Sequence, residues 1–159
     1  MNWEAVGSIA ELISGVAVLI TLIYLAIQIK QNTATAREAI LRSQTDRNMD
    51  NSKFMAGTPG MMDLFIRAMD DPDSVTKEER WRFGSYMFAM FLDFQEAYHY
   101  HVSGRQDDYW WPTQRENIKV YLRRPGGQYW WHSEGRRFLD QRFIEYVNAE
   151  LMPAIGAEQ

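Results

Sequence analysis

Hydrophobic and polar positions divide the chain into one long apolar stretch and a mixed remainder. Residues 12–29 carry no charged side chain, and their clearly polar residues are Ser14, Thr21 and Gln28. A helix rises about 1.5 Å per residue and the apolar core of a bilayer is about 30 Å thick. With the apolar residues just before it, this stretch is long enough to cross, and we expect residues 1–30 to form a transmembrane anchor.

Two other interpretations of this stretch exist. A buried core helix of a soluble bundle is one, although apolar runs of this length are rare in soluble chains. A secretory signal is the other, because Ala34-Thr35-Ala36 resembles a cleavage site. Against a signal, the leading residues carry Glu4 where a signal has Lys or Arg, and the apolar run is longer than a signal needs. We therefore expect a retained anchor.

Charges on either side of the anchor predict its orientation. Glu4 and Glu11 are the only charged side chains before the apolar stretch, whereas Lys30, Arg37 and Arg42 follow it. Basic residues stay on the cytoplasmic side of a membrane. The N-terminus should therefore lie outside, and the rest of the chain should be cytoplasmic.

Small and polar residues gather on one face of the predicted anchor. Several recur at a spacing of seven, and a second column, which ends at Tyr24, runs beside them. Lipid gives helices no hydrophobic reason to associate, so membrane helices meet through small residues and hydrogen bonds. We expect this face to pair with a copy of itself or with a partner; a lone anchor that tolerates small residues is the alternative. The face consists of Gly7, Ala10, Ser14, Ala17, Thr21 and Gln28.

Residues 31–56 should continue the helix as a polar neck, with Asn32-Thr33 as the expected irregularity, because no Gly or Pro occurs there before Gly57. Residues 57–159 should form a cytoplasmic α-helical domain of about four to five helices. Its first helix should start with Thr58 as cap and Pro59 in the first turn, and should stop at Asp71-Pro72.

The next helix should open at Thr76, which forms a capping box with Glu79, and should end near Val102, before Gly104. Gly84 lies on its apolar face, where it could let a neighbouring helix or ring come close or simply be tolerated. The residues expected to face inward are Trp81, Phe88, Phe91, Tyr98 and Val102, with Met87 and Phe94 beside them.

Two more helices should complete the domain, one over residues 111–124 and one over residues 136–151, separated by a break at residues 125–127 and a short aromatic segment. No alternating strand pattern appears, so the fold class is all-α. The inward residues of these helices should be Trp111, Ile118, Leu122, Leu139, Phe143, Tyr146 and Val147.

Composition excludes several classes of function. The chain has no cysteine, which rules out disulfides, thiolate metal sites and a cysteine nucleophile. Its formal charge is −4, and without Glu4 and Glu11 it holds 17 basic and 19 acidic residues. This near-neutral body does not favour nucleic-acid binding.

The chain resembles a large group of short, uncharacterised bacterial proteins, each with one N-terminal transmembrane helix and a small helical cytoplasmic domain. The resemblance rests on residues 24–33 (YLAIQIKQNT), on residues 76–81 (TKEERW), and on Pro125-Gly126-Gly127 with Trp130-Trp131. It implies a single-pass protein of the bacterial inner (plasma) membrane. It implies no activity, cofactor or catalytic residue.

Familiar catalytic motifs are absent: there is no phosphate loop, GxGxxG, HExxH or nucleophile elbow. Glu96 and His99 form one Glu-x-x-His, but a di-iron bundle needs two such motifs and further carboxylates, so a polar helix edge is favoured. His99 and His101 diverge on a helix and cannot share a ligand. The Arg-x4-His pattern of one helical ribonuclease class does not occur. We predict no catalytic residue, no metal, no cofactor and no small-molecule substrate.

One cluster places two arginine pairs around an aromatic segment. It could hold a phosphate or an anionic lipid headgroup. Alternatively, the arginines complete helix ends and the tryptophans fill the core, which we favour. The cluster consists of Arg123, Arg124, Trp130, Trp131, His132, Arg136 and Arg137.

The favoured function is a non-enzymatic structural or accessory membrane protein that self-associates through its anchor or joins a larger membrane complex. An oligomeric pore whose polar faces (Glu11, Ser14, Thr21 and Gln28) surround a conducting path is the first alternative. A membrane-tethered enzyme that uses the Arg-Trp-His region is the second.

Overall fold

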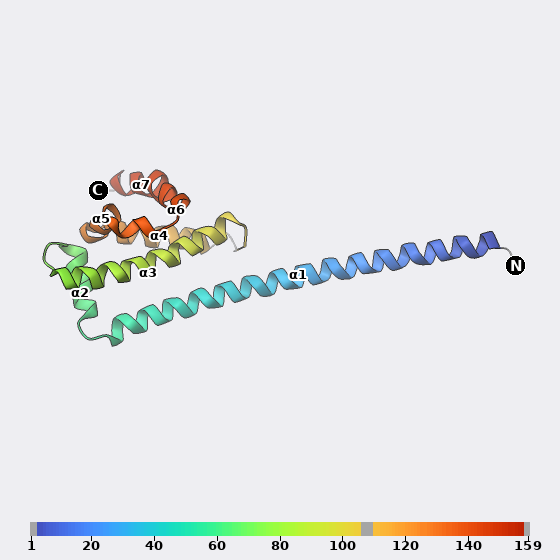
Figure 1. Cartoon of the computed structure of the whole chain (residues 1–159), viewed down its shortest axis with the longest axis horizontal. Coiled ribbons are helices and arrows are strands. Elements are labelled where there is room, and N and C mark those ends of the chain that lie inside the picture. The colour runs from blue at the N-terminus through green and yellow to red at the C-terminus, as the bar shows by residue number, and fades with distance from the viewer. Residues whose placement is uncertain (1–2, 106–109, 158–159) are drawn as a thin grey trace. The chain divides into compact units, whose positions relative to one another are not determined.

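The computed structural model describes residues 3–105 and 110–157, and these form helices and turns with no strand among them. The fold is all-α, as the sequence predicts. One long apolar N-terminal helix is followed by a group of shorter helices that pack together (Figure 1). Contacts divide the chain into a first unit, residues 1–42, and a second unit, residues 43–159, which we call the body.

Helix α1 covers Trp3–Gly57. The irregularity expected at Asn32-Thr33 is wrong, because the helix continues through both residues. The Thr33 hydroxyl donates a 2.8 Å hydrogen bond to the carbonyl of Ile29, one turn earlier, so its polar group is satisfied without a break. The helix ends at Gly57, the first glycine after Gly15.

Helix α2, Met61–Asp70, begins later than predicted. The expected cap at Thr58 with Pro59 in the first turn is wrong: both residues lie in the turn before the helix, and Gly60 is the N-cap. Gly60 has φ +75°, a left-handed conformation that glycine adopts without steric cost. The end of the helix at Asp71 is as predicted, and the Asp71 N–H donates to the Arg67 carbonyl at 2.8 Å.

Helix α3, Lys77–Val102, has the predicted bounds. The Glu79 N–H donates to the Thr76 hydroxyl at 3.2 Å, and the Thr76 N–H donates to Glu79 Oε2 at 2.8 Å, which completes the predicted capping box. After the helix ends, Gly104 takes φ +64°.

The buried face of α3 is rotated from the predicted one. Phe91, Met87 and Phe94 are buried as expected, but Trp81 is 71% exposed and Val102 is 64% exposed, so these two assignments are wrong. Phe88 and Tyr98 are half-buried. Apolar residues occur all round this helix, so packing selects the face, whose other buried members are Phe83, Met90 and Ala97.

Helices α4, Trp110–Leu122, and α5, Pro125–His132, follow. Trp111, Ile118 and Leu122 are buried as predicted. The expected break at residues 125–127 is displaced: Pro125 opens α5, and Gly126 and Gly127 lie buried in its first turn. A Cβ at Gly126 would overlap the α2 backbone at Ala68, and one at Gly127 would overlap the α4 backbone at Tyr121. These glycines allow close helix contact and do not interrupt a helix.

The predicted last helix over residues 136–151 is also corrected. A 3-10 turn η1, Glu134–Phe138, comes first, and then α6, Gln141–Tyr146, a π-helical turn η2, Val147–Leu151, and α7, Met152–Ala157. The Asp140 carboxylate caps α6 by accepting from the N–H groups of Arg142 (2.9 Å) and Phe143 (3.3 Å). The π-helical turn η2 lies just before Pro153, which has no backbone N–H to donate to a helical hydrogen bond.

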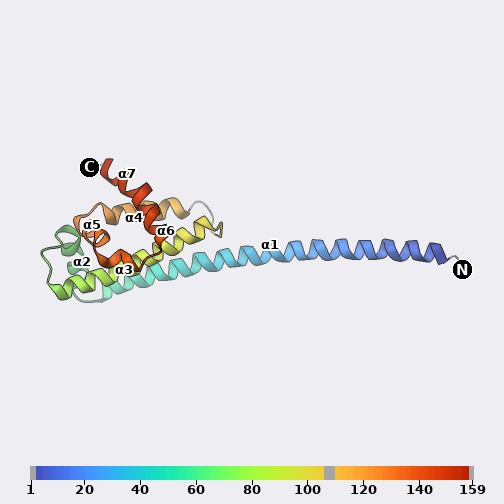
Figure 2. The ribbon, with the colours of Figure 1, turned by 45° about the horizontal axis from the view of Figure 1, so that its top comes forward.

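The core of the body forms where α5 packs against α2, α3 and α4 (Figure 2). Trp131, Phe91, Met87 and Phe143 are fully buried. The ring centres of Trp130 and Trp131 lie 4.7 and 5.5 Å from the ring centre of Phe91. Leu139 and Val147 are buried as predicted, and Tyr146 is half-buried.

Candidate functional site

The apolar part of the first unit is a candidate membrane-spanning helix. By length and composition it is able to cross a bilayer, and none of its most apolar window is buried. Leu12 and Ile20, for example, are exposed on the helix surface. A core helix would bury such side chains, so this exposure counts against that alternative. A membrane anchor and a signal sequence both fit.

The small-residue face lies along this helix. Its exposed members are Gly7, Ser14, Ala17, Thr21 and Gln28. The side chain of Ala10 lies outside the described part of the chain. Thr21 donates its hydroxyl hydrogen to the Ala17 carbonyl at 2.9 Å. Gln28 donates its amide to the Tyr24 hydroxyl at 2.9 Å. These bonds within the helix lower the cost of placing polar groups in lipid.

The two tryptophans of the Arg-Trp-His cluster lie inside the body. Trp130 is 4% exposed and Trp131 is 0% exposed. Each indole N–H has a partner in the protein: Trp130 donates to the Gly84 carbonyl at 3.2 Å, and Trp131 donates to Asn148 Oδ1 at 2.9 Å. These side chains fill the core, which agrees with the alternative favoured from the sequence.

The charged members of the cluster fall into two groups at opposite ends of α5. Arg123 and Arg124 precede the helix, and Arg124 forms an ion pair with Asp70 of α2. Arg136 lies in η1 with its guanidinium 5.8 Å from the Trp131 ring centre, and Arg137 follows it on the surface. His132, at the end of α5, is exposed. Anion or headgroup binding by these residues stays a prediction, and each group would have to act by itself.

Glu96 and His99 contact different side chains. Glu96 Oε2 lies 2.6 Å from Arg47 Nη2, and Glu96 Oε1 accepts from the Tyr100 hydroxyl at 2.7 Å. His99 Nε2 lies 3.9 Å from Asp140 Oδ1 instead. Across residues 3–105 and 110–157, no three His, Asp or Glu side chains gather in a way that could hold a metal ion. The ring of His101 stacks on Trp111, with centres 5.4 Å apart.

Arg47 bridges two acidic side chains of α3, a contact that the sequence did not reveal. Its Nε lies 3.1 Å from Asp93 Oδ1, and its Nη2 binds Glu96. Burial raises the pKa of Asp93, and the nearby Arg47 charge opposes that rise. The bridge joins the last part of α1 to α3 inside the body. No local pattern marks it, since its partners lie far along the chain.

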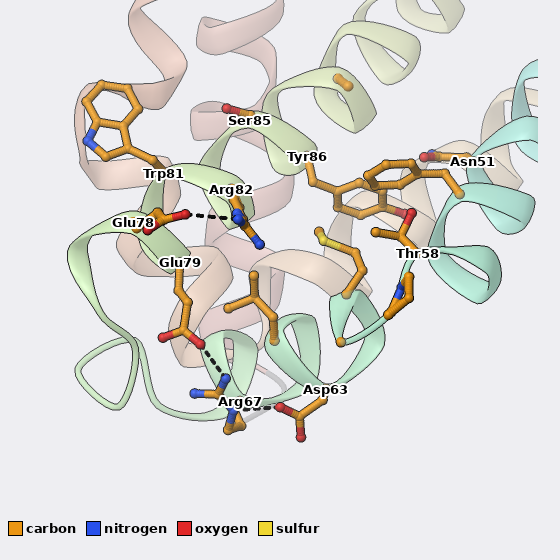
Figure 3. A pocket seen from close by; sticks show the side chains of 16 residues that line it. Asn51, Thr58, Asp63, Arg67, Glu78, Glu79, Trp81, Arg82, Ser85 and Tyr86 are labelled. Carbon is orange, nitrogen blue, oxygen red and sulfur yellow. Dashed lines mark hydrogen bonds and ion pairs between the residues drawn. The ribbon is translucent and has the colours of Figure 1, made fainter.

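A groove of about 880 Å³ runs between the end of α1, α2 and the first half of α3 (Figure 3). Phe54 and Tyr86 stack at one end, with ring centres 6.1 Å apart. Met61 and Leu64 contribute from α2, and Trp81 lies at the other end, exposed. The sequence placed Trp81 in the core, so it missed this surface.

Acid–base pairs border the groove. Arg67 lies 2.9 Å from Asp63 and 2.7 Å from Glu79, and Arg82 lies 2.9 Å from Glu78 (Figure 3). Hydrogen bonds from Arg67 and then from the Thr76 backbone lower the pKa of Glu79 to about 2. Each of the three acids along the groove is therefore paired with one of two arginines, and the surface between these pairs is largely apolar.

No protein-family model, curated protein or solved structure shows significant similarity to this chain. No family is therefore identified. The structure shows one long apolar N-terminal helix followed by a small helical domain.

Proposed function

We propose that this protein is a non-enzymatic, single-pass membrane protein that acts as a scaffold or accessory component and self-associates through its anchor. The observation that carries the proposal is the small-residue face on a helix whose most apolar window has no buried side chain. In lipid, such a face lets two helix backbones approach closely and gain van der Waals contact.

The proposed location is the bacterial inner membrane, with the N-terminus outside and the body in the cytoplasm. Glu4 and Glu11 precede the span, and Lys30, Arg37 and Arg42 follow it. Retention of cationic residues on the cytoplasmic side supports this orientation. Membrane lipids and further copies of the chain, or a larger membrane complex, are its proposed partners.

The test is the mass of the detergent-solubilised particle, measured by light scattering with the detergent contribution subtracted. We expect a discrete oligomer. Ser14→Leu combined with Ala17→Leu should lower its mass, because the larger side chains hold the helices apart. Ile23→Leu, which conserves volume on the lipid-facing side, is the matched control and should leave the mass unchanged.

A monomeric native particle, or a double variant with the native mass, would contradict self-association through this face. A ring-sized oligomer that also dissipates the membrane potential when expressed would favour the alternative, an oligomeric pore.

A further inference from the structure

The groove collects large apolar side chains that water can reach. Trp81 is the most exposed tryptophan of the body, and Phe54 is about half exposed. Exposed apolar side chains that line a groove mark interaction sites in soluble domains.

Charges on the two long walls of the groove narrow the choice of occupant. Each wall carries an acid and a base four residues apart: Asp63 and Arg67 on α2, and Glu78 and Arg82 on α3. The further acid of the lining, Glu79, is paired with Arg67 across the groove. In a twofold-symmetric contact the same surface of each copy meets the other in reversed direction. Where an acid precedes a base along a helix, the acid of one copy therefore lies opposite the base of the other copy. In such a contact the exposed pair of Glu78 and Arg82 is electrostatically complementary to the same pair of a second copy.

The pair on α3 is free to exchange partners at low cost. Glu78 and Arg82 are 78% and 66% exposed, and an ion pair so open to water contributes little to the stability of one copy. Across an interface that excludes water, the same charges select the correct register. Trp81 lies between them on the exposed side of α3, and tryptophan is among the residue types that most often dominate binding energy.

We propose that the groove is the contact surface for a second copy of this chain, with Trp81 of each body seated against the groove of the other about a twofold axis. This inference rests on the proposed function in that paired anchors would hold two bodies at high effective concentration, which strengthens a weak contact.

Inter-copy distances test the contact directly. The chain has no cysteine, so Ser85→Cys places a single spin label on the groove side of α3 with little change in side-chain volume. In the full-length protein in detergent, pulsed electron paramagnetic resonance should give a short, narrow distribution of distances between the labels of two copies. Asn117→Cys, on the exposed side of α4, is the matched control and should give a longer distance. Adding Trp81→Ala should broaden the distribution measured from position 85.

A charge exchange separates contact between copies from contact within one copy. Glu78→Arg places a base at both positions of the pair, and Arg82→Glu places an acid at both, so each variant alone should lose the narrow distance. A mixture of the two should recover it, because acid meets base only across the interface. Neither variant regains its internal pair in the mixture.

The outcomes are distinguishable. An oligomeric particle with a broad distribution from position 85, or one insensitive to Trp81→Ala, would overturn the groove contact and leave anchor pairing intact. A monomeric particle would overturn both. A different protein that co-purifies and shields the thiol of the Ser85→Cys variant from the label would show that the groove binds that protein and not a second copy.

Discussion

The indole N–H of Trp130 donates a 3.2 Å hydrogen bond to the carbonyl oxygen of Gly84, 46 residues earlier in the chain. The ring therefore lies against α3 at the one position of that helix without a side chain. A Cβ built at Gly84 would be 3.8 Å from Trp130 Cδ1, which is ordinary van der Waals contact. The space therefore accepts a methyl group.

Gly84→Ala should accordingly stabilise the body by up to about 1 kcal/mol, since alanine is a better helix former than glycine. Gly84→Val should destabilise it, because the extra methyl groups would press on the indole. Urea unfolding followed by tryptophan fluorescence measures both. A loss of stability in the alanine variant would show that the indole cannot tolerate even a methyl group.

Gly126→Ala should destabilise the body by about 3 kcal/mol, since the added methyl would overlap the α2 backbone and force α2 and α5 apart. Gly156→Ala is the matched control. It lies in a helix with nothing within 4 Å of its added Cβ, and should be neutral or slightly stabilising. Equal effects from the two substitutions would disprove the close contact. Urea unfolding midpoints provide the comparison.

Arg47→Met should cost about 1–2 kcal/mol of unfolding free energy, because it leaves Asp93 and Glu96 half-buried beside each other without a cation. Lys53→Met removes an ion pair whose members are 70% and 75% exposed, and should change stability by less than about 0.5 kcal/mol. Adding Asp93→Asn to Arg47→Met should recover part of the loss. Thermal denaturation of the native chain and the three variants tests this.

The hydrogen bond from Arg67 to Glu79, together with the capping box, should make stability depend on pH in an acidic window. The pKa of Glu79 is lowered to about 2 from its ordinary value near 4.5, so the folded state favours the ionised form. Its contribution is complete above about pH 4.5 and disappears as the pH falls towards 2. The difference in melting temperature between the native chain and Glu79→Gln should therefore be present at neutral pH and vanish at the acidic end of this window. A constant difference would contradict this cause.

Orientation is tested by a reporter fused after Gln159. The basic residues that follow the span predict that alkaline phosphatase at this position is inactive and that a fluorescent protein folds there. Glu4→Lys combined with Glu11→Lys weakens the charge asymmetry and should produce a mixed population. An active phosphatase on the native sequence would show that the C-terminus lies outside, opposite to the proposed topology.

Local sequence signals predicted much of the fold. The capping box at Thr76, the stop at Asp71, and the long apolar helix are all present, because each depends on contacts within about one helical turn. The small-residue face could likewise be read directly, since positions on a single helix follow from its period. What that face binds stays a prediction.

The candidate surfaces of the body depend on residues that only folding brings together. The Arg47 bridge joins α1 to α3, and the groove needs α1, α2 and α3 at once. No spacing rule reports such contacts. Trp81 was misassigned for the same reason: α3 is apolar on several sides, and its neighbours decide which side is covered.

The sequence by itself determined that this protein is all-α, with one helix apolar enough to cross a membrane, because backbone hydrogen bonding and apolar length act locally. Only the tertiary structure decided how the glycines are used. Gly60 turns the chain into α2, and Gly126 and Gly127 let α5 reach the backbones of α2 and α4. A glycine permits both a turn and a close approach, and the surrounding helices determine which one it provides.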